Sequence, residues 1–554
     1  MRLKHVLWMG AAAAALLSTG CATDDPQLAG ALETITAEDV ARHIQVLAAD
    51  SFEGRAPASL GEVKTIEYVR SQFAELGLEP GNGDSYFQQV PLVSITADPN
   101  TRLTVRGGGT TTSYAYGRDM MAWTKRVTER AGARDAELVF VGYGIVAPEY
   151  DWNDYEGVDV RGKMVVMLVN DPGFATKDSS LFTGNAMTYY GRWTYKFEEA
   201  ARKGAIGALA VHETEWAGYP WDVVKGSWSG EQFDLVHEDG NMSRVAVEGW
   251  ITRDAANAVF EQAGLDFESL KSEAATRDFE AVPMGVTASI ALRNTVRRST
   301  SNNVVAVWPG SDRADEYVVY MGHWDHLGLD PTLEGDQIYN GALDNATGIA
   351  GLFQVARAFT SLETRPQRSV MFLAVTAEEQ GLLGSEYYAT HPVVPLAKTV
   401  GAINMDGLNV IGRMRDVTVI GLGYSELDDY LAEAARAQRR RVRPDPESEK
   451  GFYFRSDHFS FAKQGVPALN ADAGIDHVEH GEQWTLERRA EYTAEKYHKP
   501  ADEYDPDWDL SGLVDDLRLV FRVGYALATD STFPNWREGT PFKATRDSMM
   551  AEVR

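Results

Sequence analysis

The chain is almost free of cysteine. Cys21 is the only cysteine among 554 residues, and it lies near the N-terminus. One thiol cannot form an intramolecular disulfide, so core packing and bound metals have to hold the folded protein together. Hydrophobic residues make up 44% of the chain. That share is ordinary for a globular protein with a substantial core.

Positive charge is also scarce. The chain has 53 Lys and Arg against 81 Asp and Glu, which gives a formal net charge of -28 at pH 7. A surface this acidic repels phosphate groups before any contact forms, so we do not expect nucleic acid as a partner. Solubility is the simplest role for the excess of acidic residues.

Long apolar runs are missing except at the N-terminus. Basic residues at positions 2 and 4 precede the run Val6–Leu17, which only Gly10 interrupts. This run is too short to cross a bilayer as a helix, but it suits the hydrophobic part of an export signal. We therefore expect residues 1–21 to be a signal peptide and the protein to be exported.

Small residues connect this run to the cysteine. Ser18, Thr19 and Gly20 precede Cys21, and Ala22 follows it. The order resembles the lipobox of bacterial lipoproteins, although Ser18 stands where leucine is commonest. The resemblance implies a lipid anchor on Cys21, which would attach the protein to the periplasmic face of the outer membrane. The alternative is an ordinary signal peptide cut nearby, which would give a soluble periplasmic or secreted protein.

The length of the chain exceeds one ordinary domain, so we expect two folded units. Apolar residues at helical spacing mark residues 36–78 and 513–527, and strands alternate with helices after "SNNVVAVWPG" (residues 301–310) as far as residue 469. Short apolar strands dominate from residue 136 to about 287. We predict an α/β fold with a mostly parallel central sheet flanked by helices and interrupted by a β-rich insert.

This pattern gives explicit boundaries. We expect the α/β domain to be discontinuous, with the insert between its two parts and a loose tail at the end. The predicted ranges are 31–110 for the first part, 111–289 for the insert, 290–535 for the second part and 536–554 for the tail.

Acidic or imidazole side chains, which can bind metal ions or transfer protons, follow three apolar strands at the point where each strand ends. "EYVVYMG" leads to His323 and Asp325, "SVMFLAVTA" leads to Glu378 and Glu379, and "VGAIN" leads to Asp406. The carboxyl ends of parallel strands meet at one edge of a sheet, where open α/β sheets bind their ligands. We therefore expect these side chains to converge.

Two more candidates lie outside these strands. Asp344 stands in the loop "YNGALDNATG", which opens a helix, and His498 stands in "KYHKPADEY". Zinc accepts imidazole nitrogen and carboxylate oxygen as ligands. Two ions that share a carboxylate lower the pKa of a water between them and polarise a substrate carbonyl. The sequence therefore favours a site for two zinc ions.

Six motifs in a fixed order resemble one family. "GHWDHLG", "IYNGALDNATG", "TAEEQGLLGS", "NMDG", "RSDHFSF" and "YHKPADEY" resemble the zinc aminopeptidases of peptidase family M28. The resemblance covers roughly the whole mature chain. Leu343 stands where an aspartate is commoner in the family, but that position is not a ligand. The insert resembles a protease-associated domain, which lies beside the active-site cleft in relatives.

The resemblance implies a role for each candidate. It assigns one zinc ion to His323, Asp344 and Asp406, and the other to Asp344, Glu379 and His498. It makes Glu378 the general base and Asp325 the residue that orients His323. Tyr497 matches a tyrosine that hydrogen-bonds the developing oxyanion in some members, and Arg455 matches an arginine near the substrate carbonyl or product carboxylate.

Other histidines carry no metal role in this interpretation. We expect His326, at the end of "HWDH", to be a packed loop histidine. His477 and His480 are expected to line the cleft or the surface, and His458 to lie behind the ligands.

The expected function is that of a two-zinc exopeptidase that removes N-terminal residues from peptides. A hydroxide bridging the metals would attack the scissile carbonyl, and Glu378 would pass its proton to the leaving amine. Relatives pair acidic groups with the substrate ammonium, and Glu378, Asp406 and Asp457 are the candidates here.

Two alternatives stay open. A zinc carboxypeptidase acting on acidic dipeptides would need more basic residues in the cleft than Arg455. A non-catalytic binding module of the same fold would not need the full set of ligands and the base. The sequence does not indicate an oligomeric state.

Overall fold

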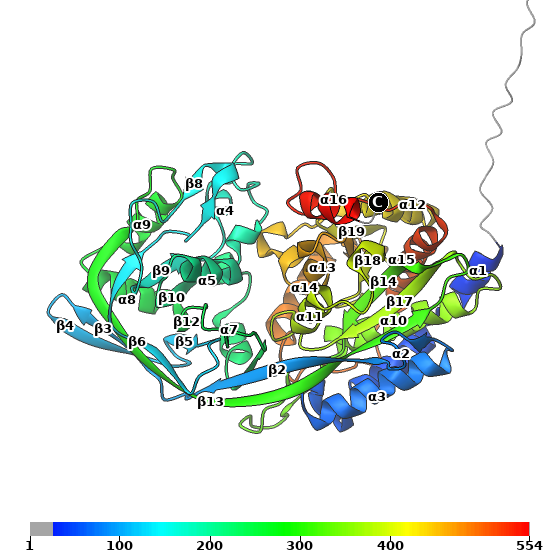
Figure 1. Ribbon diagram of the computed structural model, residues 1–554, viewed down its shortest axis with the longest axis horizontal. Helices are drawn as coiled ribbons and strands as arrows, with labels where there is room; N and C mark the ends of the chain where they lie inside the picture. The colour runs from blue at the N-terminus through cyan, green and yellow to red at the C-terminus, as the bar shows by residue number, and fades with distance from the viewer. Residues whose placement is uncertain (1–25, 553–554) are drawn as a thin grey trace, which may run out of the picture.

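The computed structural model describes residues 26–552 as two lobes that lie side by side (Figure 1). In the larger lobe, helices cover both faces of a twisted sheet, and the smaller lobe is built around a second sheet. The expected signal peptide and Cys21 lie outside the described residues. Over residues 26–552, no helix is both long enough and apolar enough to cross a membrane.

The sheet of the larger lobe has a parallel centre. Strand β14 pairs in parallel with β17 on one side and β18 on the other, and β18 pairs in parallel with β21. Antiparallel strands extend the sheet beyond β17. The strand order is β20 (Arg441–Pro444), β19 (Asp416–Ile420), β21 (Ala468–Ala473), β18 (Thr399–Asn404), β14 (Arg313–His323), β17 (Arg368–Val375), β13 (Val282–Trp308), β2 (Phe87–Ala97) and β11 (Glu231–Leu235).

Successive residues of the central strands face two different hydrophobic cores. Tyr320 and Phe372 belong to the core on one face, and Val319 and Met371 belong to the core on the other. A parallel sheet buried on both faces needs apolar residues throughout, which explains the continuous apolar runs in these strands. The first core includes helices α2 (Ala37–Leu47), α3 (Leu60–Glu75), α10 (Thr347–Thr360), α12 (Leu427–Ala437) and α15 (Ser511–Thr529), and the second includes α11 (Leu383–Thr390) and α13 (His458–Lys463).

The smaller lobe has a mixed sheet with a hydrophobic core on each face. Its central strands β6, β9, β10 and β12 are parallel, and antiparallel strands flank them. The strand order is β4 (Thr110–Ala115), β3 (Arg102–Gly107), β13, β6 (Arg130–Phe140), β9 (Met164–Leu168), β10 (Gly207–His212), β12 (Val247–Thr252) and β5 (Met120–Trp123). The helices that concern the site are α5 (Trp193–Arg202) and α7 (Trp221–Ser227).

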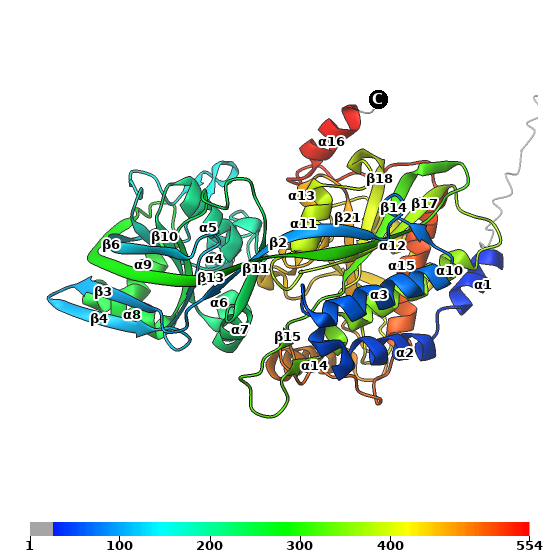
Figure 2. The ribbon, with the colours of Figure 1, turned by 60° about the horizontal axis from the view of Figure 1, so that its bottom comes forward.

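One long strand connects the two lobes. Strand β13 has 27 residues and runs from the sheet of the smaller lobe into the sheet of the larger lobe (Figure 2). Leu292 belongs to a core of the smaller lobe, whereas Val304 belongs to a core of the larger lobe. In addition, β11 from the insert pairs with β2 and extends the sheet of the larger lobe. Hydrogen bonds of two strands therefore fix how the lobes meet.

The insert begins earlier in the chain than predicted. The Thr- and Gly-rich stretch is the hairpin of β3 and β4, which places Leu103, Val105 and Tyr114 in a core of the smaller lobe. The lobes therefore separate before Arg102 rather than at residue 111. The predicted end at residue 289 falls inside the continuous strand β13.

The prediction of a loose tail over 536–554 is wrong for the part that the structure describes. Trp536 is buried, and its indole N–H donates to the carbonyl of Gly465 at 2.8 Å. Helix α16 (Lys543–Ala551) follows, and its buried Arg546 donates to the carbonyl of Thr399 at 3.0 Å. These two side chains satisfy backbone carbonyls of the larger lobe, which holds the segment in place.

A buried histidine in α2 makes the stability of the larger lobe depend on pH. His43 is 1% exposed, its Nδ1 lies 2.8 Å from the hydroxyl of Tyr68, and its ring packs 4.8 Å from the ring of Phe353. Burial, together with the positive charges of Arg42 and Arg357, lowers the pKa of His43 from 6.5 to about 4. Between these values the folded state binds fewer protons than the unfolded state, so stability falls as the pH falls.

We predict that His43→Gln weakens this pH dependence. The wild-type protein should lose about 1 to 3 kcal/mol of unfolding free energy between pH 6.5 and 4 through this residue alone. Urea unfolding at several pH values should therefore show a smaller loss for the variant than for wild type. His391→Gln changes an exposed histidine and serves as the control. Identical pH dependence of wild type and His43→Gln would contradict the prediction.

Candidate active site

His323, the last residue of β14, is at the centre of the candidate site. Its Nε2 lies 3.2 Å from Asp344 Oδ1 and 3.2 Å from Asp406 Oδ1. Asp406 follows the end of β18, so neighbouring parallel strands deliver these two groups to the same edge of the sheet. The carboxylate of Glu378, which follows β17, lies 3.9 Å from the same nitrogen.

Asp344 also contacts the second histidine. Its Oδ2 lies 3.5 Å from His498 Nε2, while Glu379 Oε2 lies 2.9 Å from that nitrogen. One carboxylate therefore reaches two imidazole rings with its two oxygens. The structure brings all five of the predicted metal ligands into one cluster, although they come from positions up to 175 residues apart.

The second nitrogen of each imidazole ring is held by a hydrogen bond. His323 Nδ1 lies 3.1 Å from the backbone carbonyl of Asp325, and His498 Nδ1 lies 3.2 Å from the hydroxyl of Ser227. A carbonyl only accepts, so Nδ1 of His323 carries a proton, and Nε2 is the nitrogen that can give its lone pair to a bound metal ion. Imidazole nitrogens and carboxylate oxygens then converge at 2.9–3.5 Å, an arrangement that protons or metal ions between them stabilise.

The electrostatics of the cluster also favour cations. Burial lowers the pKa of His323, but the carboxylates of Glu378, Asp406 and Asp344 outweigh it and raise the pKa well above its usual value. Burial likewise lowers the pKa of His498, and Glu379 and Asp344 raise it overall. The cluster therefore has more negative charge than its histidines balance, and His323, Asp344 and Asp406 are close enough together to bind a metal ion. This donor set fits a divalent metal of borderline softness such as zinc.

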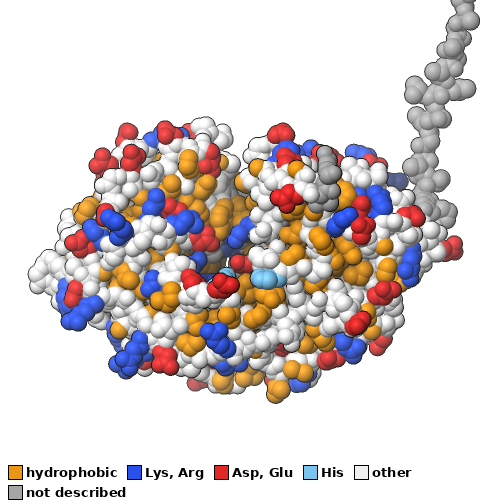
Figure 3. Space-filling model, viewed as in Figure 1, with side chains coloured by type: hydrophobic (Ala, Val, Ile, Leu, Met, Phe, Trp, Pro, Cys, Tyr) orange, Lys and Arg blue, Asp and Glu red, His pale blue; other side chains and the backbone are white. Residues whose placement is uncertain are grey.

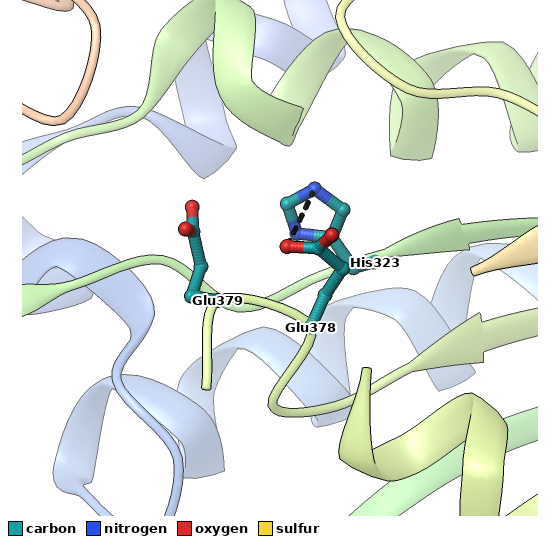
Figure 4. Close-up of side chains that lie close together, drawn as sticks. All are labelled: His323, Glu378 and Glu379. Atoms are coloured by element: carbon teal, nitrogen blue, oxygen red, sulfur yellow. Dashed lines mark ion pairs between the residues drawn. The ribbon is translucent and has the colours of Figure 1, made fainter. Parts of the chain in front are cut away.

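Asp325 fixes the two adjacent glutamates. Its carboxylate accepts hydrogen bonds from the backbone N–H of Glu378 at 3.1 Å and of Glu379 at 3.4 Å. Figure 4 shows the glutamates beside His323 with both carboxylates on the same side of the loop. The carboxylate of Asp325 stays 3.9 Å from His323 Nδ1, so the backbone carbonyl of Asp325 makes the closer contact with that nitrogen. The predicted orienting residue thus acts on the glutamate loop as well as on the histidine.

Asp502 was not predicted, and it positions Asp344. Its carboxylate accepts the backbone N–H groups of Leu343 and Asp344, each at 3.1 Å, and the hydroxyl of Tyr492 at 3.1 Å. Asp502 lies four residues after His498 in "YHKPADEY", so the same segment supplies a candidate ligand and the support for another. Only its place inside that motif could have indicated this role.

Arg55 is a second supporting residue that the sequence did not reveal. It is 1% exposed, and its guanidinium donates to the backbone carbonyls of Trp324, Leu47, Asn340 and Gly341 at 2.5–2.9 Å. It therefore ties the end of α2 to the loop after His323 and to the loop before Asp344. A lone arginine among small residues has no sequence signature for such a role.

His326 lies closer to the site than expected. It is buried, as predicted, but its Nδ1 is 2.5 Å from Glu379 Oε1. Together with Asp344 and Glu379 it forms one of the groups that could hold an ion. His326 therefore fixes the second oxygen of Glu379, while His498 faces the first.

Residues of the motif "RSDHF" lie behind and beside Asp406. The hydroxyl of Ser456 donates to Asp406 Oδ2 at 2.6 Å and accepts from the amide of Asn404 at 2.7 Å. Asp457 and His458 are fully buried. Asp457 therefore cannot reach a substrate ammonium, and the expectation that it is a candidate for this role is wrong.

A cleft of about 300 Å³ opens in front of the cluster, and Asp344, Glu378 and Asp406 lie in its wall. Figure 3 shows a hollow between the two lobes with histidine and acidic side chains beside it. Arg455 and Tyr497 line the cleft, and Arg455 donates to the hydroxyl of Tyr497 at 3.2 Å. Tyr497 stacks on His498 with ring centroids 3.9 Å apart.

The smaller lobe takes part in the site. Gly218 and Tyr219 line the cleft, and Ser227 of α7 contacts the candidate ligand His498. Ser227 is the hydrogen-bond partner of the outer nitrogen of this ring, so it helps to hold the orientation of the ring.

We predict that Ser227→Ala lowers the affinity for divalent metal about 10- to 100-fold, because the ring of His498 loses its orienting partner. Competition with a chromophoric chelator measures this affinity without relying on activity. Ser229→Ala is the matched control, because the Ser229 hydroxyl donates to the carbonyl of Lys225 at 2.5 Å and is not in contact with His498. Equal affinities in the two variants would contradict the role of Ser227.

Comparison with known proteins agrees with this geometry. Residues 303–521, which contain all the candidate ligands, match the model of Peptidase family M28. The chain is 27% identical over 266 residues to a probable leucine aminopeptidase 2 of Aspergillus oryzae, covering 46% of this chain and 49% of that protein. It is 24% identical over 367 residues to the probable glutamate carboxypeptidase AMP1 of Arabidopsis thaliana, covering 62% of this chain and 47% of that protein. The matches thus span less than half the length of these curated relatives.

A solved structure shares the fold of almost the whole chain. The aminopeptidase from Aneurinibacillus sp. strain AM-1 aligns with a TM-score of 0.54 and 20% identity, over 92% of this chain and 97% of that one. The similarity supports the α/β architecture, while the likeness of the insert to a protease-associated domain stays a prediction. The part of the chain that carries the site is therefore similar to peptidase family M28.

Proposed function

We propose that this protein is a two-zinc aminopeptidase that hydrolyses the N-terminal peptide bond of its substrates. The observation that carries the proposal is the carboxylate of Asp344, whose two oxygens face the Nε2 atoms of His323 and His498. A shared carboxylate between two imidazoles suits a pair of metal ions a few ångströms apart. The names of the relatives, which include leucine aminopeptidase, agree with this proposal.

Each ion would have its own ligands. His323 and Asp406 would complete one site and Glu379 and His498 the other, with Asp344 in both. When bound, two zinc ions supply a water of lowered pKa and polarise the carbonyl of the scissile bond. The remaining steps depend on groups of the chain itself.

Glu378 is the proposed general base. Its carboxylate lies in the cleft wall, and Asp325 fixes its backbone. It takes the proton of the attacking water and then delivers it to the leaving amine. Tyr497 has its hydroxyl oriented by Arg455, so it can donate a hydrogen bond to the oxygen that becomes negative.

The enzyme would select the N-terminal peptide bond because acidic groups in the cleft accept hydrogen bonds from the substrate's free ammonium group. Glu378 and Asp406 are the candidates that line the cleft. A charge-assisted hydrogen bond to a free ammonium in a partly desolvated cleft contributes about 2 to 4 kcal/mol, or about 30- to 1000-fold in rate.

Two alternative functions would require different groups in the same site. Relatives named glutamate carboxypeptidase suggest cleavage of acidic dipeptides, which requires cationic groups that hold the substrate carboxylates. A non-catalytic binding module has no need for Glu378, whose carboxylate nonetheless lies beside the candidate ligands.

The decisive experiment compares unblocked aminoacyl anilides with N-acetylated copies and with C-terminally acidic dipeptides. We expect kcat/KM to fall about 30- to 1000-fold on acetylation, because the acidic groups lose their partner. Equal turnover of free and acetylated substrates would reject the aminopeptidase assignment. Cleavage of only the acidic dipeptides would favour the carboxypeptidase, and no turnover by zinc-loaded protein would favour the binding module.

A further inference from the structure

The glutamate loop, residues 376–383, has a strained backbone. Ala377 and Leu382 have φ values of 53° and 66°. Residues with a Cβ rarely adopt positive φ, and such a conformation persists only where neighbouring groups hold the backbone in place. The groups that hold this loop therefore also control the position of the two glutamates that it carries.

Part of this support comes from β13 and Asp325. The amide of Asn303 in β13 accepts the backbone N–H of Thr376 at 3.0 Å and donates to the carbonyl of Gly384 at 2.9 Å. Asp325 accepts the backbone N–H groups of the two glutamates. The residue that follows them, Gln380, has its partner in the other lobe.

Strand β11 of the smaller lobe supplies the rest. Oε1 of Gln380 accepts the backbone N–H of Phe233 at 3.1 Å. Strand β11 is at the edge of its sheet, so the N–H groups on its outer side need partners from outside the sheet. Beside this hydrogen bond, Phe233 and Leu235 form a buried apolar cluster with Ala377 and Leu383 of the glutamate loop. Figure 2 shows β11 where the two lobes meet.

Glu378 depends on the loop backbone more than Glu379 does. The carboxylate of Glu379 lies 2.5 Å from His326 Nδ1 and 2.9 Å from His498 Nε2, so side-chain contacts hold it. The carboxylate of Glu378 lies 3.9 Å from His323 Nε2, which is beyond hydrogen-bond distance. The position of the proposed base is therefore set mainly by the loop that carries it.

We propose that Gln380 is a positioning residue for the general base, and that the smaller lobe acts on catalysis through it. The hydrogen bond to β11 keeps the glutamate loop in the conformation that places Glu378 in the cleft wall. A base must lie within hydrogen-bond reach of its proton, and a displacement of about 1 Å can lower the rate about 100-fold. This inference rests on the proposed peptidase function.

The first test is Gln380→Met, which keeps the length of the side chain and removes the acceptor. At saturating zinc we expect kcat to fall about 10- to 100-fold and KM to stay within about 2-fold of the wild-type value, because the base is displaced while the substrate contacts remain. Gln232→Met is the matched control in β11. The Gln232 amide donates to the carbonyl of Ser229 at 3.0 Å, so this variant should keep the wild-type kcat.

Hydrogen exchange of the zinc-loaded protein measures the state of the loop without relying on activity. The backbone N–H groups of Gly381, Leu382 and Leu383 donate within the loop at 2.8–3.1 Å, so they should exchange slowly in the wild type. In Gln380→Met they should exchange about 10-fold faster or more, while the amides of β17 keep their wild-type rates. Leu235→Ala removes apolar packing from the side of the smaller lobe and should change kcat and loop exchange in the same direction.

An unchanged kcat at saturating zinc in folded Gln380→Met would overturn the inference, and so would a lower kcat with unchanged exchange of the loop. Fast exchange of the loop amides in the wild type would overturn it even if neither variant folded. If the wild type cleaves no peptide at all, the proposed peptidase function fails instead, and the exchange rates still test the contact between Gln380 and β11.

Discussion

The carboxylate of Asp344 is the group on which the rest of the site depends. It faces His323 with one oxygen and His498 with the other, and Asp502 holds its backbone N–H. A carboxylate buried among other acids is unfavourable unless positive charge balances it. The histidines supply part of that charge, and metal ions would supply the rest. The neighbouring loops are arranged to keep this one carboxylate between two imidazoles.

Several parts of the fold hold Asp344 and the groups around it in place. Parallel strands β14, β17 and β18 end at the same edge and deliver His323, Glu378 and Asp406. Arg55 then fixes the loops after His323 and before Asp344 through their backbone carbonyls. The smaller lobe adds Ser227, which contacts the outer nitrogen of His498. Strand β13 couples the two lobes, so the position of the insert bears directly on the geometry of the site.

Residues that follow a strong pattern could be predicted, and residues that act through backbone contacts could not. Apolar strands ending in acids or histidine indicated the convergence of His323, Glu379 and Asp406, because parallel strands share an edge. Arg55 and Asp502 act on carbonyl and N–H groups, which any residue can supply, so no spacing marks them. The hairpin at Arg102–Ala115 and the packed helix α16 were missed for a related reason. Polar, glycine-containing stretches resemble linkers until their partners are known.

The most direct test of the account is the zinc content of extensively dialysed protein, measured together with its activity. The account predicts two zinc ions per chain in the wild type. Glu378→Gln should keep both ions and lose activity by orders of magnitude, because proton transfer fails, whereas Glu379→Gln should lose metal as well. A fully active protein with at most one tightly bound ion, or the reverse phenotypes for the two glutamates, would contradict the account.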